Sequence, residues 1–228
     1  MKKNKIGKVV FSAFVKNIIG MVVLGAILFL AAGTLRYWQA WAMLPALMVP
    51  MGVSGIIFAM QDSGILERRS YKWDSMTAKR KASIILKYAA TLSLIIVPAL
   101  DYRFGWSTIP LALIIIGVAF LVSANVVWIV SKTENPFAGS GIEIYEGHKL
   151  CKTGLYAIVR HPNYFGDILL VFGLPLALGS WWGIIGAVPL LALLVERTFD
   201  EERFLNKHLS GYKEYMQEVR WRFIPALW

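Results

Sequence analysis

The stretch ILLVFGLPLALGSWWGIIGAVPLLALLV, residues 168–195, decides the fold of this chain. As one straight helix, its 28 residues would measure about 42 Å, whereas the hydrocarbon core of a bilayer is about 30 Å thick. Near its middle, the residues GSWWG at 179–183 combine turn formers with tryptophans that favour the membrane interface. We therefore predict that the stretch folds back on itself as a tight hairpin of two short helices.

Four more apolar runs of helix length precede this stretch, at residues 18–35, 41–60, 84–100 and 109–130. A backbone group left unpaired in lipid costs several kcal/mol, so a membrane-spanning segment of this length is expected to be a helix of about 20 residues. We predict an all-α polytopic membrane bundle, with four spans and the C-terminal hairpin making five to six membrane segments.

The composition supports one integral-membrane domain over residues 1–228. The chain has 57% hydrophobic and 17% charged residues, whereas soluble domains are about half apolar and a quarter charged. The single cysteine, Cys151, excludes an intrachain disulfide. The three histidines, His148, His161 and His208, lack the spacing of a helical zinc pair, so we expect no metal site.

The basic residues predict the orientation. Of 24 Lys and Arg residues, 22 lie in the segments 1–17, 61–87, 131–163 and 196–228. Cytoplasmic loops are enriched in these residues, so both termini are expected in the cytoplasm, which requires the final stretch to double back. The net charge of +10 then reflects topology and anionic lipid, and we expect no nucleic-acid partner. A cleaved signal peptide is the alternative for the first apolar run, but its long basic region and the spans that follow favour an uncleaved helix.

The first candidate for a functional element is GLYAIVRHPNYFG at residues 154–166. Proline is favoured in the first helical turn because its missing N–H would be unpaired there, so Pro162 marks a helix start with His161 at its mouth. By composition alone, the simplest interpretation is an interfacial helix start that carries Arg160, His161 and Tyr164.

The second candidate is the charged segment 196–203, which follows the hairpin directly. Arg197 and Glu201 are four residues apart and share a helix face, whereas Glu202 points about 140° away from Arg197. The simplest interpretation is a solvated ion pair worth a few tenths of a kcal/mol. Acids and arginines near membrane depth also favour a functional role.

Taken together, these elements resemble the isoprenylcysteine carboxyl methyltransferase and phospholipid methyltransferase superfamily of integral-membrane enzymes. The resemblance covers residues 133–228, whereas the first four helices carry no comparable signature. The residues that carry it are Gly147, His148, Lys149, Leu150, Thr153, Gly154, Leu155, Tyr156, the run Arg160 to Gly166, the broken hairpin around Gly179 to Gly183, and then Arg197, Glu201, Glu202, Leu205, Gly211, Tyr212, Tyr215, Val219, Arg220, Arg222, Ile224 and Pro225. On this basis, 1–130 is assigned to four membrane helices and 131–228 to the cofactor-binding and catalytic region.

The resemblance implies S-adenosylmethionine as methyl donor, with S-adenosylhomocysteine as product. Acids can bind the ribose hydroxyls or the ammonium group of this donor, aromatic faces can cover its sulfonium or adenine, and histidines can supply further hydrogen bonds. By family analogy the donor contacts are His148, Leu150, Gly154, Tyr156, Arg160, His161, Pro162, Tyr164, Glu201 and Glu202.

The catalytic residues implied by the resemblance are Arg197 and Glu201. Arg197 can hold a carboxylate acceptor by a two-pronged hydrogen bond, with Glu201 fixing the guanidinium. For an amine acceptor, Glu201 can instead receive a proton. A lipophilic small molecule or a prenylated acceptor can enter sideways from the membrane lipids, and no obligate protein partner is evident.

Two other functions remain open. NADPH-dependent membrane reductases of the sterol or steroid type also resemble this chain, in an RHPNYxG-like element and a basic, aromatic C-terminal tail. Residues 147–150 and the arrangement of Arg197, Glu201 and Glu202 are more similar to the methyltransferases. A small membrane scaffold or transporter is the third possibility, and the absence of an internal repeat disfavours an inverted-repeat transporter.

Overall fold

The computed structural model describes residues 2–61, 78–137, 144 and 148–228, and within these ranges all regular structure is helical. Gly147 and the middle of the basic segment 61–87 therefore lie outside the described residues. The elements are α1 (Lys2–Ala32), α2 (Trp38–Gln61), α4 (Ala78–Phe104), α5 (Leu111–Glu134), η2 (Gly154–Ala157), α6 (Pro162–Ala177), η3 (Trp182–Gly186), α7 (Ala187–His208) and α8 (Tyr212–Glu218). The predicted all-α class is confirmed.

The four predicted N-terminal spans correspond to α1, α2, α4 and α5, each of which contains a segment long and apolar enough to cross a bilayer. The predicted runs extend beyond their helices at two points. The first predicted span runs past the end of α1, because the chain turns at Gly33, which has a φ of +69°. The fourth begins at Leu111, because Pro110 occupies the N-cap of α5.

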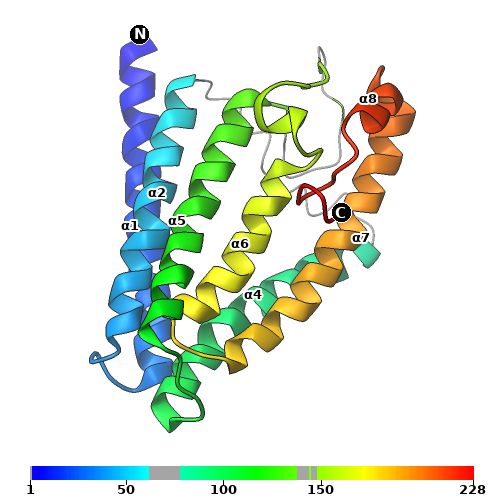
Figure 1. Ribbon diagram of the computed structural model, residues 1–228. Helices are drawn as coiled ribbons and strands as arrows, with labels where there is room; N and C mark the ends of the chain where they lie inside the picture. Colours follow the sequence, from blue (N-terminus) through cyan, green and yellow to red (C-terminus); the bar gives the residue numbers. More distant parts are fainter. Residues whose placement is uncertain (1, 62–77, 138–143, 145–147) are drawn as a thin grey trace.

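The predicted hairpin is present over α6, η3 and α7 (Figure 1). The chain reverses at Gly179, whose φ of +78° is a conformation that glycine adopts readily. The two arms are unequal: α6 has 16 residues and α7 has 22. The expectation of two short helices is therefore wrong for the second arm, since α7 continues past the apolar stretch and carries residues 196–208.

The turn of the hairpin is tied to the bundle by buried polar groups. Ser180 donates a hydrogen bond to the buried carboxylate of Asp101 in α4, and the backbone N–H of Ser107 donates to the same carboxylate at 2.7 Å. The Tyr37 hydroxyl donates to the carbonyl of Leu178. Asp101, Ser180 and Tyr37 thus each have a hydrogen-bond partner, which avoids the cost of leaving these buried groups unpaired.

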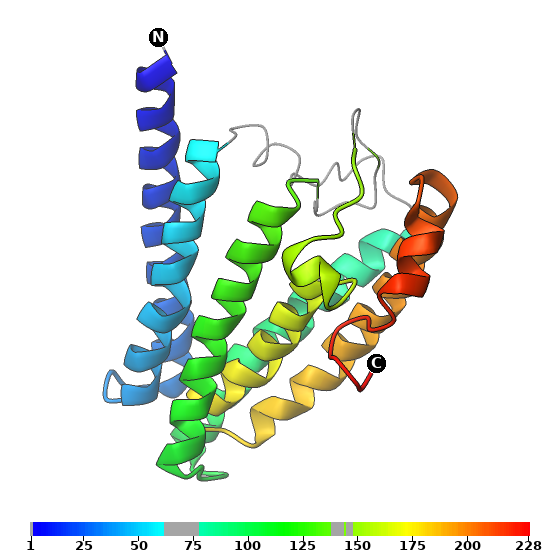
Figure 2. The same cartoon turned by 45° about the horizontal axis from the view of Figure 1, so that its top comes forward.

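Helices α5 and α6 lie side by side at close range (Figure 2). A Cβ added at Gly117 would collide with the backbone of Leu176 and Ala177, and one at Gly173 would lie 3.1 Å from the carbonyl oxygen of Gly117. Glycine on both helices therefore allows their backbones to approach, as small residues do in membrane helix pairs. This contact lies near the C-terminal end of α6 and fixes that helix against α5.

The start of α1 and helix α8 lie at the same end of the bundle (Figure 1). If α6 and α7 each cross the membrane, the chain has an even number of crossings and both termini lie on the same side, as the basic residues predict. Which side of the membrane this end faces stays a prediction.

Candidate functional site

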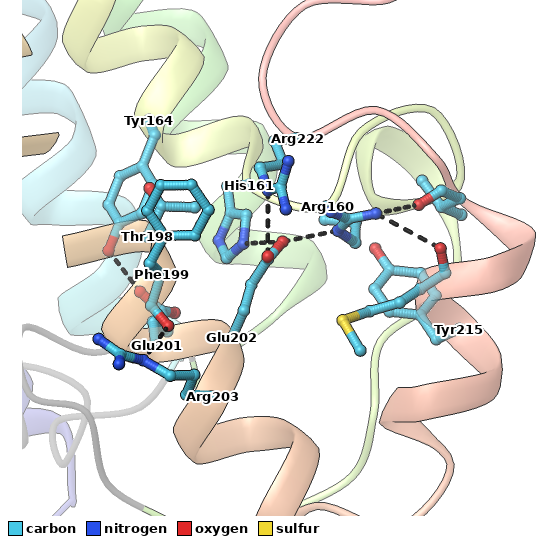
Figure 3. Close-up of polar contacts among 12 residues, drawn as sticks. Arg160, His161, Tyr164, Thr198, Phe199, Glu201, Glu202, Arg203, Tyr215 and Arg222 are labelled. Atoms are coloured by element: carbon cyan, nitrogen blue, oxygen red, sulfur yellow. Dashed lines mark hydrogen bonds and ion pairs between the residues drawn. The ribbon is translucent and has the colours of Figure 1, made fainter. Parts of the chain in front are cut away.

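A polar cluster lies where the start of α6, the second half of α7 and the C-terminal segment meet (Figure 3). The segments come together because α6 and α7 run as a hairpin, so that the end of α7 returns to the level at which α6 begins. The two constellations recognised in the sequence, 154–166 and 196–203, are therefore neighbours in the fold.

The centre of the cluster is a buried ion pair between Arg160 and Glu202. The Arg160 Nε donates to Glu202 Oε1 at 2.7 Å, and the two side chains are 6% and 8% exposed. Arg222 Nε donates to Glu202 Oε2 at 3.0 Å, and His161 Nε2 lies 3.3 Å from Oε1 (Figure 3). Three nitrogen groups thus surround this one carboxylate, which is the compensation that a buried charge requires.

The same arginine holds the C-terminal segment in place. Arg160 Nη1 donates to the carbonyls of Val219 at 2.8 Å and Arg220 at 3.1 Å. The backbone N–H groups of Arg160 and His161 donate to the carbonyls of Trp221 and Arg222, both at 2.9 Å. The Arg160–Glu202 pair therefore connects the entry to α6, the helix α7 and the C-terminal segment.

Glu201 faces a different partner from its neighbour Glu202. The Tyr164 hydroxyl donates to Glu201 Oε2, and Arg197 Nε donates to the Tyr164 oxygen at 2.8 Å. Tyr164 is buried, whereas Arg197 and Glu201 are half-buried. The sequence prediction that Arg197 and Glu201 share a helix face is confirmed by their common contact with Tyr164.

His161 and Pro162 begin α6 as the sequence predicts, with His161 at the N-cap and Pro162 in the first turn. The His161 ring stacks on the Tyr164 ring, with centroids 5.3 Å apart, and Phe223 meets the edges of both. One face of the Tyr164 ring is therefore covered by His161. The expected aromatic contact of Tyr164 with a ligand stays a prediction.

His148 and Leu150 lie on the loop that precedes η2. His148 stacks on Phe137, with ring centroids 4.7 Å apart, and burial lowers the pKa of its imidazole. Leu150 packs against the aromatic cluster of Tyr212 and Tyr215. Leu150, one of the two predicted donor contacts on this loop, therefore lies beside α8, the helix that follows α7.

Gly154 and Tyr156 have structural contacts of their own. Gly154 has a φ of +58°, and a Cβ there would collide with the Glu134 carboxylate, which accepts the N–H of Leu155 at 2.9 Å. The buried Tyr156 hydroxyl accepts a hydrogen bond from Asn163 at 3.3 Å. These contacts join the end of α5 to η2 and α6, and the predicted ligand roles of both residues stay predictions.

Two residues of this region were not singled out in the sequence for a role of their own. Asp167 lies one turn after Tyr164 on α6, within electrostatic reach of Lys87, Lys132 and Arg197. An acid inside an apolar helix was the available signal. Tyr212, the first residue of α8, is buried, yet its hydroxyl has no hydrogen-bond partner in the part of the chain that the structure describes. No sequence pattern predicts that a tyrosine hydroxyl will be buried without a hydrogen-bond partner.

Chemically, the cluster consists of a fixed half and an accessible half. Glu202 is occupied by Arg160, His161 and Arg222, so it stabilises the fold around the site. Arg197 and Glu201 retain partial exposure and present a cation and an anion side by side. Such a pair can bind a carboxylate through the guanidinium, or an ammonium or hydroxyl group through the carboxylate. No group of three or more metal-ligating side chains occurs among the described residues.

The fold and this cluster define a polytopic membrane protein with a polar site at one end of its helical bundle. The family model for phospholipid methyltransferase matches residues 107–211, from the segment before α5 to the turn before α8. This match, which covers somewhat less than half of the chain, bears out the resemblance to the membrane methyltransferase superfamily over that segment. It also corrects the extent of that resemblance, which in the sequence began at residue 133, because the matched region includes the fourth span, α5.

Curated relatives match a little over a third of this chain. The chain is 35% identical over 85 residues to the Delta(14)-sterol reductase TM7SF2 of Mus musculus, covering 36% of this chain and 20% of the relative. It is 36% identical over 85 residues to the Delta(14)-sterol reductase of Arabidopsis thaliana, covering 36% and 23%. With that of Methylotuvimicrobium alcaliphilum it shares 32% over 90 residues, covering 38% and 21%. The matches span about a fifth of the length of these relatives.

Proposed function

We propose that this protein transfers a methyl group from S-adenosylmethionine to a lipidic or prenylated acceptor at the cytoplasmic face of the membrane. The observation that carries the proposal is the Arg197–Tyr164–Glu201 contact, which lies inside the region matched by the phospholipid methyltransferase family model. It presents a half-buried carboxylate and guanidinium at the end of a membrane bundle.

The side chains present fit this donor. S-adenosylmethionine carries a positive sulfonium and an ammonium group, and the half-buried Glu201 offers a carboxylate to either. The half-buried carboxylate of Glu201 therefore supports the sulfonium donor.

When bound, S-adenosylmethionine supplies a methyl carbon that its positive sulfur has already activated, so the protein must chiefly align and desolvate the reactants. Arg197 holds and orients a carboxylate acceptor by paired hydrogen bonds. If the acceptor is an amine, Glu201 receives its proton as the new bond forms. In both cases Tyr164 keeps these two side chains in register.

We assign Glu202 a positioning role, which differs from the donor contact implied by the family resemblance. Its carboxylate is already surrounded by Arg160, His161 and Arg222. Replacing any of these contacts with a ligand would leave a buried cation unpaired, at a cost of several kcal/mol.

The second candidate is an NADPH-dependent reductase acting on a sterol or steroid, which the identity to Delta(14)-sterol reductases supports. These relatives act on Delta(14)-sterols by their names, and the match leaves most of their length uncovered. The two candidates share the expectation of a nucleotide ligand beside Glu201.

Calorimetry on the full chain in detergent micelles separates the candidates. We expect saturable binding of S-adenosylhomocysteine and none of NADPH. Glu201→Gln should weaken that binding, whereas Asp200→Asn, which removes the acid of an exposed ion pair on the same helix, should leave it unchanged. Transfer of labelled methyl groups into a membrane lipid extract would then identify the acceptor class. Binding of NADPH alone would replace the methyltransferase with the reductase.

A further inference from the structure

A buried tyrosine hydroxyl beside the candidate site has no partner within the described part of the protein. Tyr212 is 3% exposed, and its hydroxyl oxygen is both buried and without a hydrogen bond. A buried polar group left unpaired costs about 1–3 kcal/mol, so such groups are rare in native proteins. A ligand that hydrogen-bonds to this hydroxyl would therefore remove the free-energy cost of leaving it unpaired.

The position of Tyr212 is set by the turn between α7 and α8. Gly211 precedes it with a φ of +80°, and the Tyr212 N–H donates to the carbonyl of Leu209 at 3.2 Å. The Tyr212 ring packs with Tyr215, Leu150 and Leu205. These contacts hold the ring on its apolar sides, so the hydroxyl cannot easily move to find another partner.

The surroundings of the hydroxyl are those of the candidate site. Glu202, Glu201 and Arg160 all act on it electrostatically. Burial, followed by the charges of Glu202 and Glu201, raises the pKa of the Tyr212 hydroxyl above its ordinary value of 10.0. The group therefore keeps its proton at neutral pH and can act as a hydrogen-bond donor.

We propose that the Tyr212 hydroxyl donates a hydrogen bond to the bound nucleotide donor, at an oxygen or nitrogen acceptor of that ligand. The proposal rests on the proposed function in assuming that a nucleotide binds beside Glu201. It adds α8 to the walls of the donor site, next to Leu150 on the loop after the fourth span. Tyr212 thereby becomes a binding residue outside the set predicted from the sequence.

Tyr215 provides a matched control. It is buried, lies on the same short helix, and its hydroxyl donates to the carbonyl of Tyr156 at 2.7 Å. Removing that hydroxyl leaves a buried carbonyl without this donor, so Tyr215→Phe should lower the stability of the ligand-free protein. Tyr212→Phe removes an atom that has no partner, so the ligand-free protein should be equally stable or more stable.

The test measures thermal unfolding and S-adenosylhomocysteine binding for wild type, Tyr212→Phe and Tyr215→Phe, each as the full chain in the same detergent. We expect Tyr212→Phe to weaken binding about tenfold, the value of one hydrogen bond to a polar acceptor, without a fall in the unfolding midpoint of the ligand-free protein. The ligand-induced rise in that midpoint should shrink accordingly.

Wild-type affinity in Tyr212→Phe would overturn this inference alone, and so would a loss of ligand-free stability as large as that of Tyr215→Phe. If the wild-type protein binds NADPH and not S-adenosylhomocysteine, the same comparison is made with NADPH. Weaker NADPH binding by Tyr212→Phe would then support the inference while the methyltransferase assignment fails. Binding of neither nucleotide would overturn both.

Discussion

Arg160 and Glu202, which are 42 residues apart in the chain, form a buried ion pair with Nε and Oε1 at 2.7 Å. The pair joins the entry to α6 with the charged half of α7, and further hydrogen bonds from Arg160 attach the C-terminal segment. Glu202 is therefore central to the fold around the site, whereas its neighbour Glu201 faces the accessible side.

The first prediction concerns these two adjacent acids. Glu202→Gln should lower the free energy of unfolding by about 3–5 kcal/mol, because it leaves Arg160 and Arg222 without their carboxylate. Asp200→Asn, in an exposed pair with Arg203, should cost less than about 1 kcal/mol. Unfolding in a graded detergent series measures both. Equal costs for the two variants would contradict the structural role of Glu202.

The second prediction concerns Arg197. Arg197→Ala should abolish methyl transfer while leaving binding of S-adenosylhomocysteine intact, because the guanidinium is assigned to the acceptor. Unimpaired methylation by this variant would remove Arg197 from the mechanism. Tyr164→Phe, which keeps the ring stacked on His161, should lower kcat about tenfold or more through loss of alignment.

The third prediction concerns pH and His148. Burial lowers the pKa of His148 below its ordinary value of 6.5, so the unfolded chain takes up a proton that the folded protein does not. The free energy of unfolding is therefore unaffected by His148 at a pH above the pKa of the unfolded chain, and it falls as pH decreases below that pKa. His148→Phe, which retains a ring to stack on Phe137, should make the unfolding midpoint less sensitive to pH between about 7.5 and 5.5. An unchanged pH dependence would refute this.

The fourth prediction concerns the contact between α5 and α6. Gly117→Ala should destabilise the protein by about 1–3 kcal/mol, because the new methyl group meets the backbone of Leu176 and Ala177. Gly55→Ala is the control, since a Cβ there would lie 3.8 Å from the Cβ of Ala13, an ordinary contact distance. Thermal unfolding in detergent measures the difference, and similar midpoints would show that the helices can separate without cost.

The spans and the hairpin were predictable because bilayer thickness limits helix length directly. Residues 168–195 are too long for one crossing, and the Gly-Ser-Trp-Trp-Gly interruption marks the turn. The helical spacing of Arg197 and Glu201 predicted that the helix continues into the charged segment, but the sequence did not predict how far it runs, which is to His208. No proline or glycine interrupts residues 190–208, so the helix enters that segment without a break.

The site was predictable as a set of residues but not as an arrangement. The family resemblance assigned Glu201 and Glu202 the same role in donor binding. Only the helical spacing indicated that the two side chains point in different directions. Their different partners are distant in the chain: Tyr164 lies 37 residues before Glu201, whereas Arg160 lies 42 residues before Glu202 and Arg222 lies 20 residues after it. The orphan hydroxyl of Tyr212 is a property of packing, which no local pattern encodes.

The unequal arms of the hairpin have a consequence for the level at which chemistry takes place. Helix α6, with 16 residues, is about 24 Å long, some 6 Å less than the apolar thickness of a typical bilayer. If α6 crosses the bilayer, as the hairpin prediction requires, its first turn with Tyr164 would reach only the depth where acyl chains give way to headgroups. Under the proposed function, a lipid acceptor would then present its polar end at that depth while its tail stays in the bilayer, so that extraction would be unnecessary.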